Sequence, residues 1–93
     1  MVIAVQPKHT FTYAGARVNV YHANKGEGLP MHGHGYSHAT TCMSGSCKYT
    51  QEDVVVIADK DTQPINLLAG KNHEIEALEN GTVFVNVFED GKN

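Results

Sequence analysis

The chain has 93 residues, enough for a single domain spanning residues 1–93 with a modest core, and its formal net charge is −3. Because the charges are scattered and no run of Lys or Arg occurs, the composition argues against a nucleic-acid-binding protein and against binding to an anionic membrane surface. No apolar stretch reaches the length of a membrane span and the N-terminus has no signal-peptide pattern, so we expect a cytoplasmic protein.

In chain order, the sequence predicts short β-strands, and no segment keeps a helical period. Residues 24–28 are expected to form a loop. Strands that recur every eight to twelve residues or so are typical of a β-sandwich or a small barrel. The expected strands are residues 11–13, 17–21, 31–35, 38–44, 46–51, 54–58, 65–68, 73–78 and 83–89.

Turn signals predict how some of these strands connect. A turn at residues 14–16 joins the first two strands, and Asn80-Gly81 is a strong hairpin signal before the last strand. Residues 38–44 and 46–51 are expected to form a hairpin around Ser44-Gly45. The sequence therefore predicts an all-β chain of consecutive antiparallel strands.

The hairpin predicted around Ser44-Gly45 would place Cys42 directly opposite Cys47, which makes a cross-strand disulfide geometrically possible. Without a signal peptide, the reduced state is favoured. The two cysteines are then small buried hydrophobes beside a turn, with a redox pair or an additional metal ligand as the alternatives.

Three of the six histidines, His32, His34 and His38, lie within residues 26–45. Side chains two positions apart on a strand point to the same face, so His32 and His34 share a face. His38 keeps the same parity if the bend at residues 35–37 adds no bulge. Neutral imidazole is the commonest protein ligand for transition metals, so this spacing indicates a metal site.

A fourth histidine, His73, begins a later predicted strand. His73, Ile75 and Ala77 lie on one face of that strand, and Glu74 and Glu76 lie on the other. Paired glutamates belong in water, so we expect the His73 face to be buried. The sequence therefore predicts that His73 converges with the first three histidines.

The first cluster resembles the first motif of the cupin superfamily, G-x5-H-x-H-x3-4-E-x6-G. Gly26, His32, His34, His38 and Gly45 meet every spacing of this motif. The one departure is His38, which stands where the family usually has Glu.

The second cluster is similar to the second cupin motif, G-x5-P-x-G-x2-H-x3-N, only in its G-x2-H core, formed by Gly70 and His73. Thr62, Leu68 and Ala77 replace the first Gly, the Pro and the Asn. The two motifs together cover residues 26–77. The resemblance implies the cupin double-stranded β-helix, a jelly-roll barrel, and favours a homodimer.

The resemblance also implies that His32, His34, His38 and His73 bind one divalent transition metal ion. It favours iron or manganese, with nickel or zinc as alternatives. The other interpretation of His38 is a hydrogen-bonded pocket residue that leaves a three-histidine site. Four neutral imidazoles leave the full positive charge of the ion in place, which favours an anionic substrate or co-ligand. His9 and His22 lie outside both motifs and are expected at the surface or partly packed.

Candidates for a second catalytic group are few. The hydroxyls of Tyr36 and Tyr49 can donate to a bound oxyanion or act as acids, although both tyrosines can equally be packing residues. Arg17 is the only arginine and can bind a substrate carboxylate through two hydrogen bonds. The pattern leaves open whether Arg17 or Val18 points inward.

Three classes of function follow. The leading hypothesis is a metal-dependent enzyme, most plausibly a dioxygenase-like oxidoreductase, that acts on a small anionic molecule. The alternatives are a non-oxidative isomerase or lyase at the same metal, and a small-molecule binding module without turnover. Met31 is expected to face outward, and the strands of residues 54–58 and 83–88 are apolar on both sides, which predicts burial against a second copy of the chain.

Overall fold

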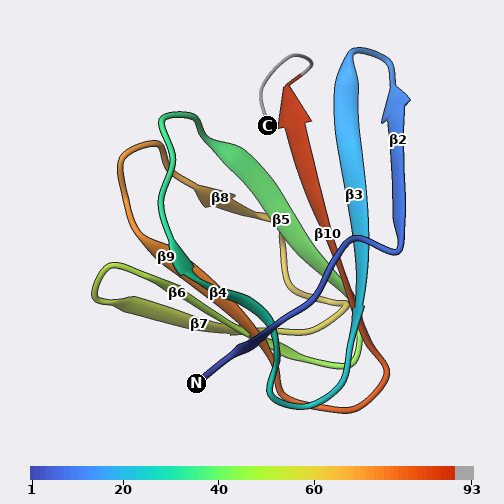
Figure 1. Ribbon diagram of the computed structural model, residues 1–93, viewed down its shortest axis with the longest axis vertical. Coiled ribbons are helices and arrows are strands. Elements are labelled where there is room, and N and C mark those ends of the chain that lie inside the picture. Colours follow the sequence, from blue (N-terminus) through green and yellow to red (C-terminus); the bar gives the residue numbers. More distant parts are fainter. Residues whose placement is uncertain (90–93) are drawn as a thin grey trace.

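Alternating apolar and polar residues build ten β-strands arranged as two five-stranded sheets (Figure 1). The structure, a computed structural model, describes residues 1–89, and these contain no helix. The first sheet has the order β1-β4-β9-β6-β7, and the second sheet has the order β2-β3-β10-β5-β8. The strands are β1 (Ile3–Ala4), β2 (His9–Tyr13), β3 (Ala16–Ala23), β4 (Glu27–His32), β5 (His38–Ser44), β6 (Cys47–Gln51), β7 (Val54–Ala58), β8 (Ile65–Leu67), β9 (His73–Ala77) and β10 (Thr82–Glu89).

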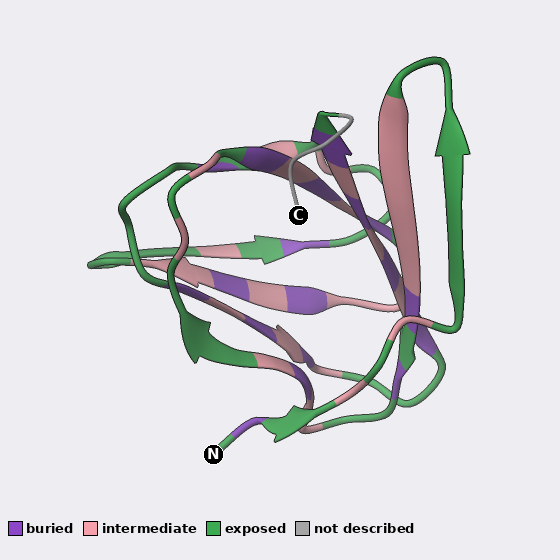
Figure 2. Cartoon of the chain, turned by 45° about the horizontal axis from the view of Figure 1, so that its top comes forward, coloured by how far each residue is buried: buried purple, intermediate pink, exposed green. Residues whose placement is uncertain are grey.

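The two sheets pack face to face, and each central strand turns alternate side chains inward. Residues along β9 and β10 therefore alternate between buried and half-buried, which is visible as banding along the strands in Figure 2. Tyr21 of β3 stacks on Phe84 of β10 with ring centroids 4.8 Å apart. The buried apolar core consists of Tyr21, Ala23, Cys42, Cys47, Tyr49, Ala58, Leu67, Ile75, Ala77 and Phe84.

Neighbouring strands in sequence pair with one another in two places. β2 and β3 form the predicted hairpin, with Tyr13 opposite Ala16. Ala14 and Gly15 have φ values of 51° and 81°, the left-handed conformation that a tight hairpin turn requires at both central positions. β6 and β7 form a second hairpin, in which Gln51 lies opposite Val54.

The predicted hairpin of residues 38–51 is wrong. β5 pairs with β10 and β8 in the second sheet, whereas β6 pairs with β7 and β9 in the first sheet. The turn after Ser44 does reverse the chain, but it carries the chain from one sheet to the other. Each strand has one apolar face, and crossing to the other sheet lets the faces of β5 and β6 be buried against each other.

The Asn80-Gly81 turn differs from its prediction in the same way. It connects β9 of the first sheet to β10 of the second sheet, so these strands are not paired with each other. Gly81 has a φ of 74°, which a glycine adopts without strain. The local turn signal was therefore correct, and only the pairing that it was expected to produce was wrong.

The strand predicted at residues 31–35 is displaced toward the N-terminus. β4 begins at Glu27, inside the expected loop, and ends at His32. Its partner β9 begins at His73, directly opposite His32, so the ladder has no further residue to pair with. Residues 33–37 consequently leave the sheet as a loop.

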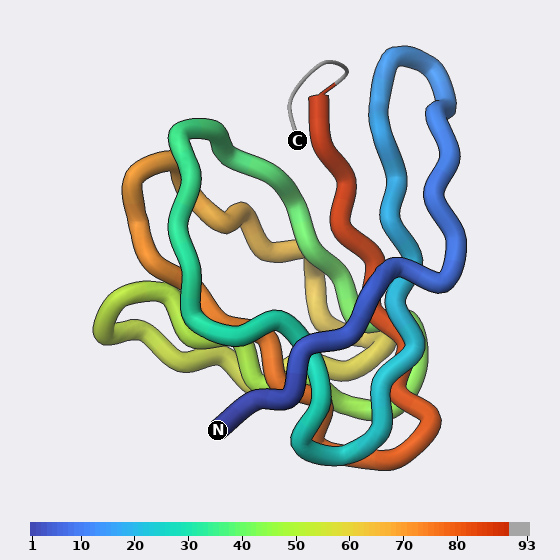
Figure 3. The backbone as a smooth tube through the Cα atoms, in the orientation of Figure 1, coloured from blue at the N-terminus to red at the C-terminus, as the bar shows by residue number. Residues whose placement is uncertain are grey.

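This loop lies beside the turn that connects β8 to β9, at one end of the molecule (Figure 3). The Gly70 N–H donates to the His34 carbonyl at 2.9 Å, and the Ala69 N–H donates to the Ser37 hydroxyl at 2.9 Å. A Cβ at Gly33 would lie 2.6 Å from the Asn72 Oδ1, so a larger residue there would displace the Asn72 side chain. The two segments that carry His34 and His73 are thus bonded to each other. No helix long and apolar enough to cross a membrane occurs among residues 1–89.

Candidate metal centre

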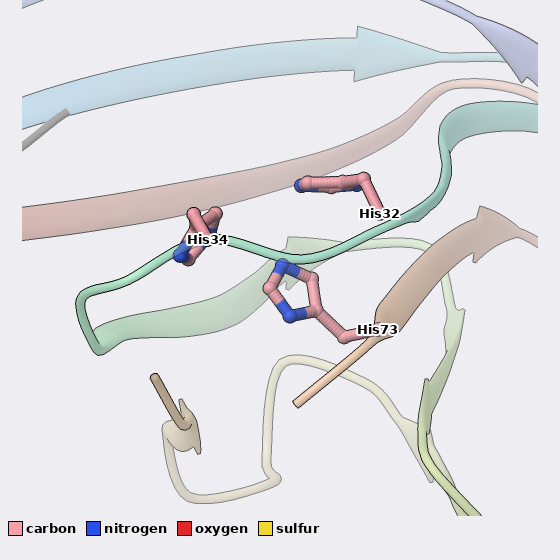
Figure 4. A group of neighbouring side chains, drawn as sticks. All are labelled: His32, His34 and His73. Atoms are coloured by element: carbon pink, nitrogen blue, oxygen red, sulfur yellow. The ribbon is translucent and has the colours of Figure 1, made fainter. Parts of the chain in front are cut away.

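Three histidine side chains meet at this end of the molecule (Figure 4). His32 ends β4, His34 lies in the following loop, and His73 begins β9. One ring nitrogen from each lies within 4.8 Å of the others. The structure therefore brings together three of the four predicted ligands from segments far apart in the sequence.

Backbone carbonyls fix the orientation of the imidazoles in the first cluster. The Nδ1 of His32 lies 2.7 Å from the Pro30 carbonyl oxygen, and the Nδ1 of His34 lies 2.7 Å from the Tyr36 carbonyl oxygen. A carbonyl only accepts, so each Nδ1 carries the proton and donates it. Each Nε2 is left with a free lone pair, the state that a metal ligand needs.

His73 is fully buried, and neither of its ring nitrogens has a hydrogen-bond partner. A buried polar atom without a partner costs about 1–3 kcal/mol, so such atoms are rare unless something binds them. A metal ion at the cluster would take up one of the two nitrogens. The residues present therefore fit a metal ion.

His38, the fourth predicted ligand, lies next to this group without being part of it. Its ring centroid is 5.1 Å from that of His34 and 5.5 Å from that of His73. The ring is buried and packs on Phe88 at a centroid distance of 4.4 Å. Both interpretations, a fourth ligand and a pocket residue, are compatible with this placement, and ligation by His38 stays a prediction.

The pKa values of both His38 and His73 are lowered to about 4, mainly by burial. The neighbouring histidines contribute to this lowering, whereas backbone groups at Ala39 and Lys71 partly oppose it. Both imidazoles are therefore neutral at pH 7, which leaves their lone pairs available to a metal without the loss of a proton.

This depression predicts a pH-dependent stability of the metal-free protein. The unfolded chain binds protons near pH 6.5, whereas folded His38 and His73 resist protonation until about pH 4. The contribution of these two histidines to the free energy of unfolding is therefore fully present above pH 6.5 and is lost as the pH falls from 6.5 to about 4. Thermal unfolding followed by circular dichroism should show a loss of about 2 kcal/mol for each of the two histidines between about pH 7 and pH 4.5.

A His38→Gln variant provides the matching comparison, because it removes one of the two titrating groups. Its stability should fall less steeply over the same pH range. A slope equal to that of the unmodified chain would mean that His38 does not carry the effect.

Known structures agree with this architecture. No family model matches the sequence, and no curated protein matches it. A cupin protein from Bacteroides fragilis has a TM-score of 0.70 at 18% identity, over 85% of this chain and 69% of that one. A double-stranded β-helix protein from Klebsiella pneumoniae has a TM-score of 0.73 at 21% identity, over 95% of this chain and 76% of that one.

The chain has the cupin fold. The predicted fold class and the predicted resemblance are thereby confirmed at the level of the fold. The Mn(II) protein oxalate decarboxylase from Bacillus subtilis is also similar, with a TM-score of 0.67 at 20% identity over 89% of this chain. This chain covers 27% of that longer protein. The histidine cluster therefore lies in a domain of cupin fold and is a candidate metal site.

Arg17 lies on the inner face of the cupin barrel. It is opposite Phe88 in the β3–β10 ladder, and directly opposed residues point to the same face. Phe88 is buried and contacts His38. The orientation that the sequence left open is thus resolved, with Arg17 at the same end of the barrel as the histidines.

The two tyrosine candidates occupy different places in the barrel. Tyr36 is half-buried and stacks on His34, with ring centroids 4.2 Å apart and an interplanar angle of 9°. Tyr49 is buried deeper, opposite Ile75, and its hydroxyl has no hydrogen-bond partner. Tyr36 therefore borders the histidine group, whereas Tyr49 lies beneath it.

Cys42 and Cys47 are free, buried thiols on strands of different sheets. The predicted cross-strand pair is therefore wrong, although both residues belong to the same core cluster. Burial and, to a smaller extent, the neighbouring Cys42 raise the pKa of Cys47 to about 12. Neither cysteine is among the described residues that could hold a metal, which argues against the additional-ligand interpretation.

The sequence interpretation missed Phe88 and a set of inward-facing polar residues, Asn19, Thr40 and Asn86. Thr40 and Asn86 are buried on strands whose other inward residues are mostly apolar. Their signal was the interruption of the alternation, as in Phe84-Val85-Asn86-Val87-Phe88, where a polar side chain occupies an inward position.

Proposed function

We propose that the protein is a metal-dependent enzyme that acts on a small anionic molecule, with dioxygenase-like oxidation as the leading reaction. The observation that carries this proposal is His73, which is fully buried with both ring nitrogens unpartnered, beside two imidazoles whose Nε2 atoms are free. A purely structural histidine would be expected to have a partner.

The charge of the site supports an anionic substrate. The group comprises His32, His34 and His73, and no carboxylate among the described residues belongs to it. A divalent ion held there would keep its charge and would supply Lewis-acid or one-electron chemistry, with iron or manganese favoured. Arg17 on the inner face at the same end of the barrel can pair with a carboxylate of the substrate.

The second candidate is a non-oxidative isomerase or lyase at the same metal. It is favoured by the structural similarity to oxalate decarboxylase, a protein that is described with Mn(II) centres. A third function, a binding module without turnover, would use the same histidines and inward-facing residues. Oxygen consumption separates the first function from the other two, and turnover without oxygen separates the second from the third.

The test starts with the metal content of untagged protein, measured by elemental mass spectrometry. One equivalent of iron or manganese, followed by oxygen uptake with a carboxylate substrate, is the expected result. His38→Ala should reduce the metal content if His38 is a ligand, with His22→Ala as the matched control outside the cluster. No bound metal, and none taken up on reconstitution, would overturn the enzyme proposal.

A homodimer is part of the same proposal. The outer face of the second sheet carries the aligned side chains Phe11, Val18 and Val87, and Val20 lies opposite Val85 in the next row. Phe11 is half exposed, and no charged side chain interrupts these rows. An apolar face of this kind is stabilised by burial against a second copy.

Light scattering after size exclusion is expected to give the mass of a dimer at low micromolar concentration. Val85→Glu places a charge in the middle of this face and should yield a monomer. Val55→Glu, on the exposed edge strand β7 of the first sheet, tests the other surface that the sequence predicts to be covered, and a dimer that persists in this variant places the interface on the second sheet. A monomeric unmodified chain would contradict the dimer.

A further inference from the structure

A layer of polar side chains crosses the inside of the barrel directly beneath the histidines. In the second sheet, Asn86 of β10 lies opposite Asn19 of β3 and opposite Thr40 of β5. Asn86 is 1% exposed and Thr40 is fully buried. These three residues therefore form one row on the inner face.

Tyr49 reaches this row from the first sheet. Its side chain is 2% exposed. Burial, the largest effect, raises the pKa of its hydroxyl, the neighbouring Cys47 raises it as well, and the adjacent Thr40 hydroxyl lowers it to a smaller extent. The Thr40 and Tyr49 hydroxyls are thus neighbours, but neither makes a hydrogen bond.

Four oxygen atoms in this layer are buried without a hydrogen-bond partner. The layer lies above the stacked rings of Tyr21 and Phe84, so its surroundings on that side are aromatic. An unpartnered buried oxygen is destabilising, and four in one layer call for a bound group that satisfies them. The four atoms are Asn19 Oδ1, Thr40 Oγ1, Tyr49 Oη and Asn86 Oδ1.

The position of the layer relates it to the metal centre. Thr40 follows His38 by two residues on β5, and Asn86 precedes Phe88 by two residues on β10. Alternate residues of a strand are about 7 Å apart, so the layer lies one step of about 7 Å below the histidines. No pocket opens among residues 1–89, so a group that enters the layer must be small.

We propose that the layer formed by Asn19, Thr40, Tyr49 and Asn86 is a second binding site inside the barrel and takes a hydroxyl group. The two amide oxygens only accept, so a group that satisfies them must donate a hydrogen bond, which a carboxylate cannot do. A hydroxyl donates to an amide oxygen and accepts from the Thr40 or Tyr49 hydroxyl. Its source is either water or the hydroxyl of a substrate anion held at the histidines, and the second source rests on the proposed function.

Whether the layer holds a water molecule is tested on the metal-free protein, so that the result does not depend on metal binding. A crystal structure at a resolution that shows ordered water should place a water within hydrogen-bond distance of Asn86 and of Thr40 or Tyr49. Thr40→Val should lose or displace this water. Thr41→Val, the next residue on the half-buried outer face of β5, is the matched control and should keep it.

The substrate source is tested on protein reconstituted with Mn(II), by binding of two matched pairs of anions. The pairs are 3-hydroxypropionate with propionate and 4-hydroxybutyrate with butyrate, which differ only by the hydroxyl. A hydroxyl bound in the layer should raise affinity by about fivefold to tenfold in one pair. Thr40→Val should abolish this preference, whereas Thr41→Val should retain it, and Tyr49→Phe serves as a second variant if Thr40→Val does not fold.

The outcomes separate the sources. Water in the layer without a hydroxyl preference assigns the site to water, and a preference that depends on Thr40 assigns it to the substrate. A dry layer whose polar atoms bond to one another, together with no preference, would overturn the proposal. Failure to bind Mn(II) would count against the proposed function and leave the water experiment decisive.

Discussion

Replacement of His73 by alanine is expected to lower the affinity for Fe(II) or Mn(II) by more than about 100-fold. Loss of a residue that only supports a metal ligand typically costs about 10–100-fold, and His73 offers a ligand atom itself. His73 is also fully buried, so its position is fixed by packing and it is held ready to bind the ion. Isothermal titration of the metal-free protein and elemental mass spectrometry of the purified protein both measure this effect.

His22→Ala is the control for this substitution, because it removes the same side chain from an exposed position on β3. It should bind metal as the unmodified chain does, and both variants should keep the β-sheet signal in circular dichroism. Equal affinity of the His73 variant and the unmodified chain would mean that the cluster is not a metal site.

Gly28→Ala is expected to destabilise the fold by about 3 kcal/mol, the upper range for forcing an extra methyl into a packed site. A Cβ at this position would overlap the carbonyl oxygen of Ile75, which belongs to the backbone and cannot turn aside. Gly28 pairs with Glu76 in the β4–β9 ladder, and the same ladder sets His32 opposite His73. Chemical unfolding should therefore show the loss of stability, and metal affinity should fall with it.

Gly26→Ala separates this overlap from ordinary backbone strain. Gly26 has a φ of 88°, but a Cβ there would meet nothing within 4 Å. Its substitution should cost about 1–2 kcal/mol, the penalty for a left-handed backbone conformation alone. Equal losses for the two variants would show that the approach of Gly28 to Ile75 does not matter.

The sequence was sufficient to predict most strands and the inward faces, because alternation is a local property. His73, Ile75 and Ala77 are buried and Glu74 and Glu76 are half-buried, as their order indicated. The crossing of the chain from one sheet to the other after β5 and after β9 was not predictable in this way. The signals at Ser44-Gly45 and Asn80-Gly81 show that the chain reverses, but not which strand it meets next.

The residues of the candidate site were easier to predict from the sequence than their arrangement in space. The spacing of His32 and His34 was interpreted as one strand, yet His34 lies in a loop whose position depends on a hydrogen bond from Gly70. Whether His38 is a ligand depends on distances of a few ångströms between elements, which no local pattern encodes. The buried row of Asn19, Thr40 and Asn86 was missed because the polar residues are single interruptions of three separate strands.

The exchange of the chain between sheets also has a consequence for the order of folding. Only the β2–β3 and β6–β7 pairings join strands that are consecutive in the sequence. The other pairings join strands that are far apart in the sequence. Proteins dominated by pairings of this kind fold slowly, in about milliseconds to seconds. During synthesis, His32 and His34 cannot meet His73 until β9 has left the ribosome and paired with β4. A site that contains all three histidines can therefore form only late in synthesis.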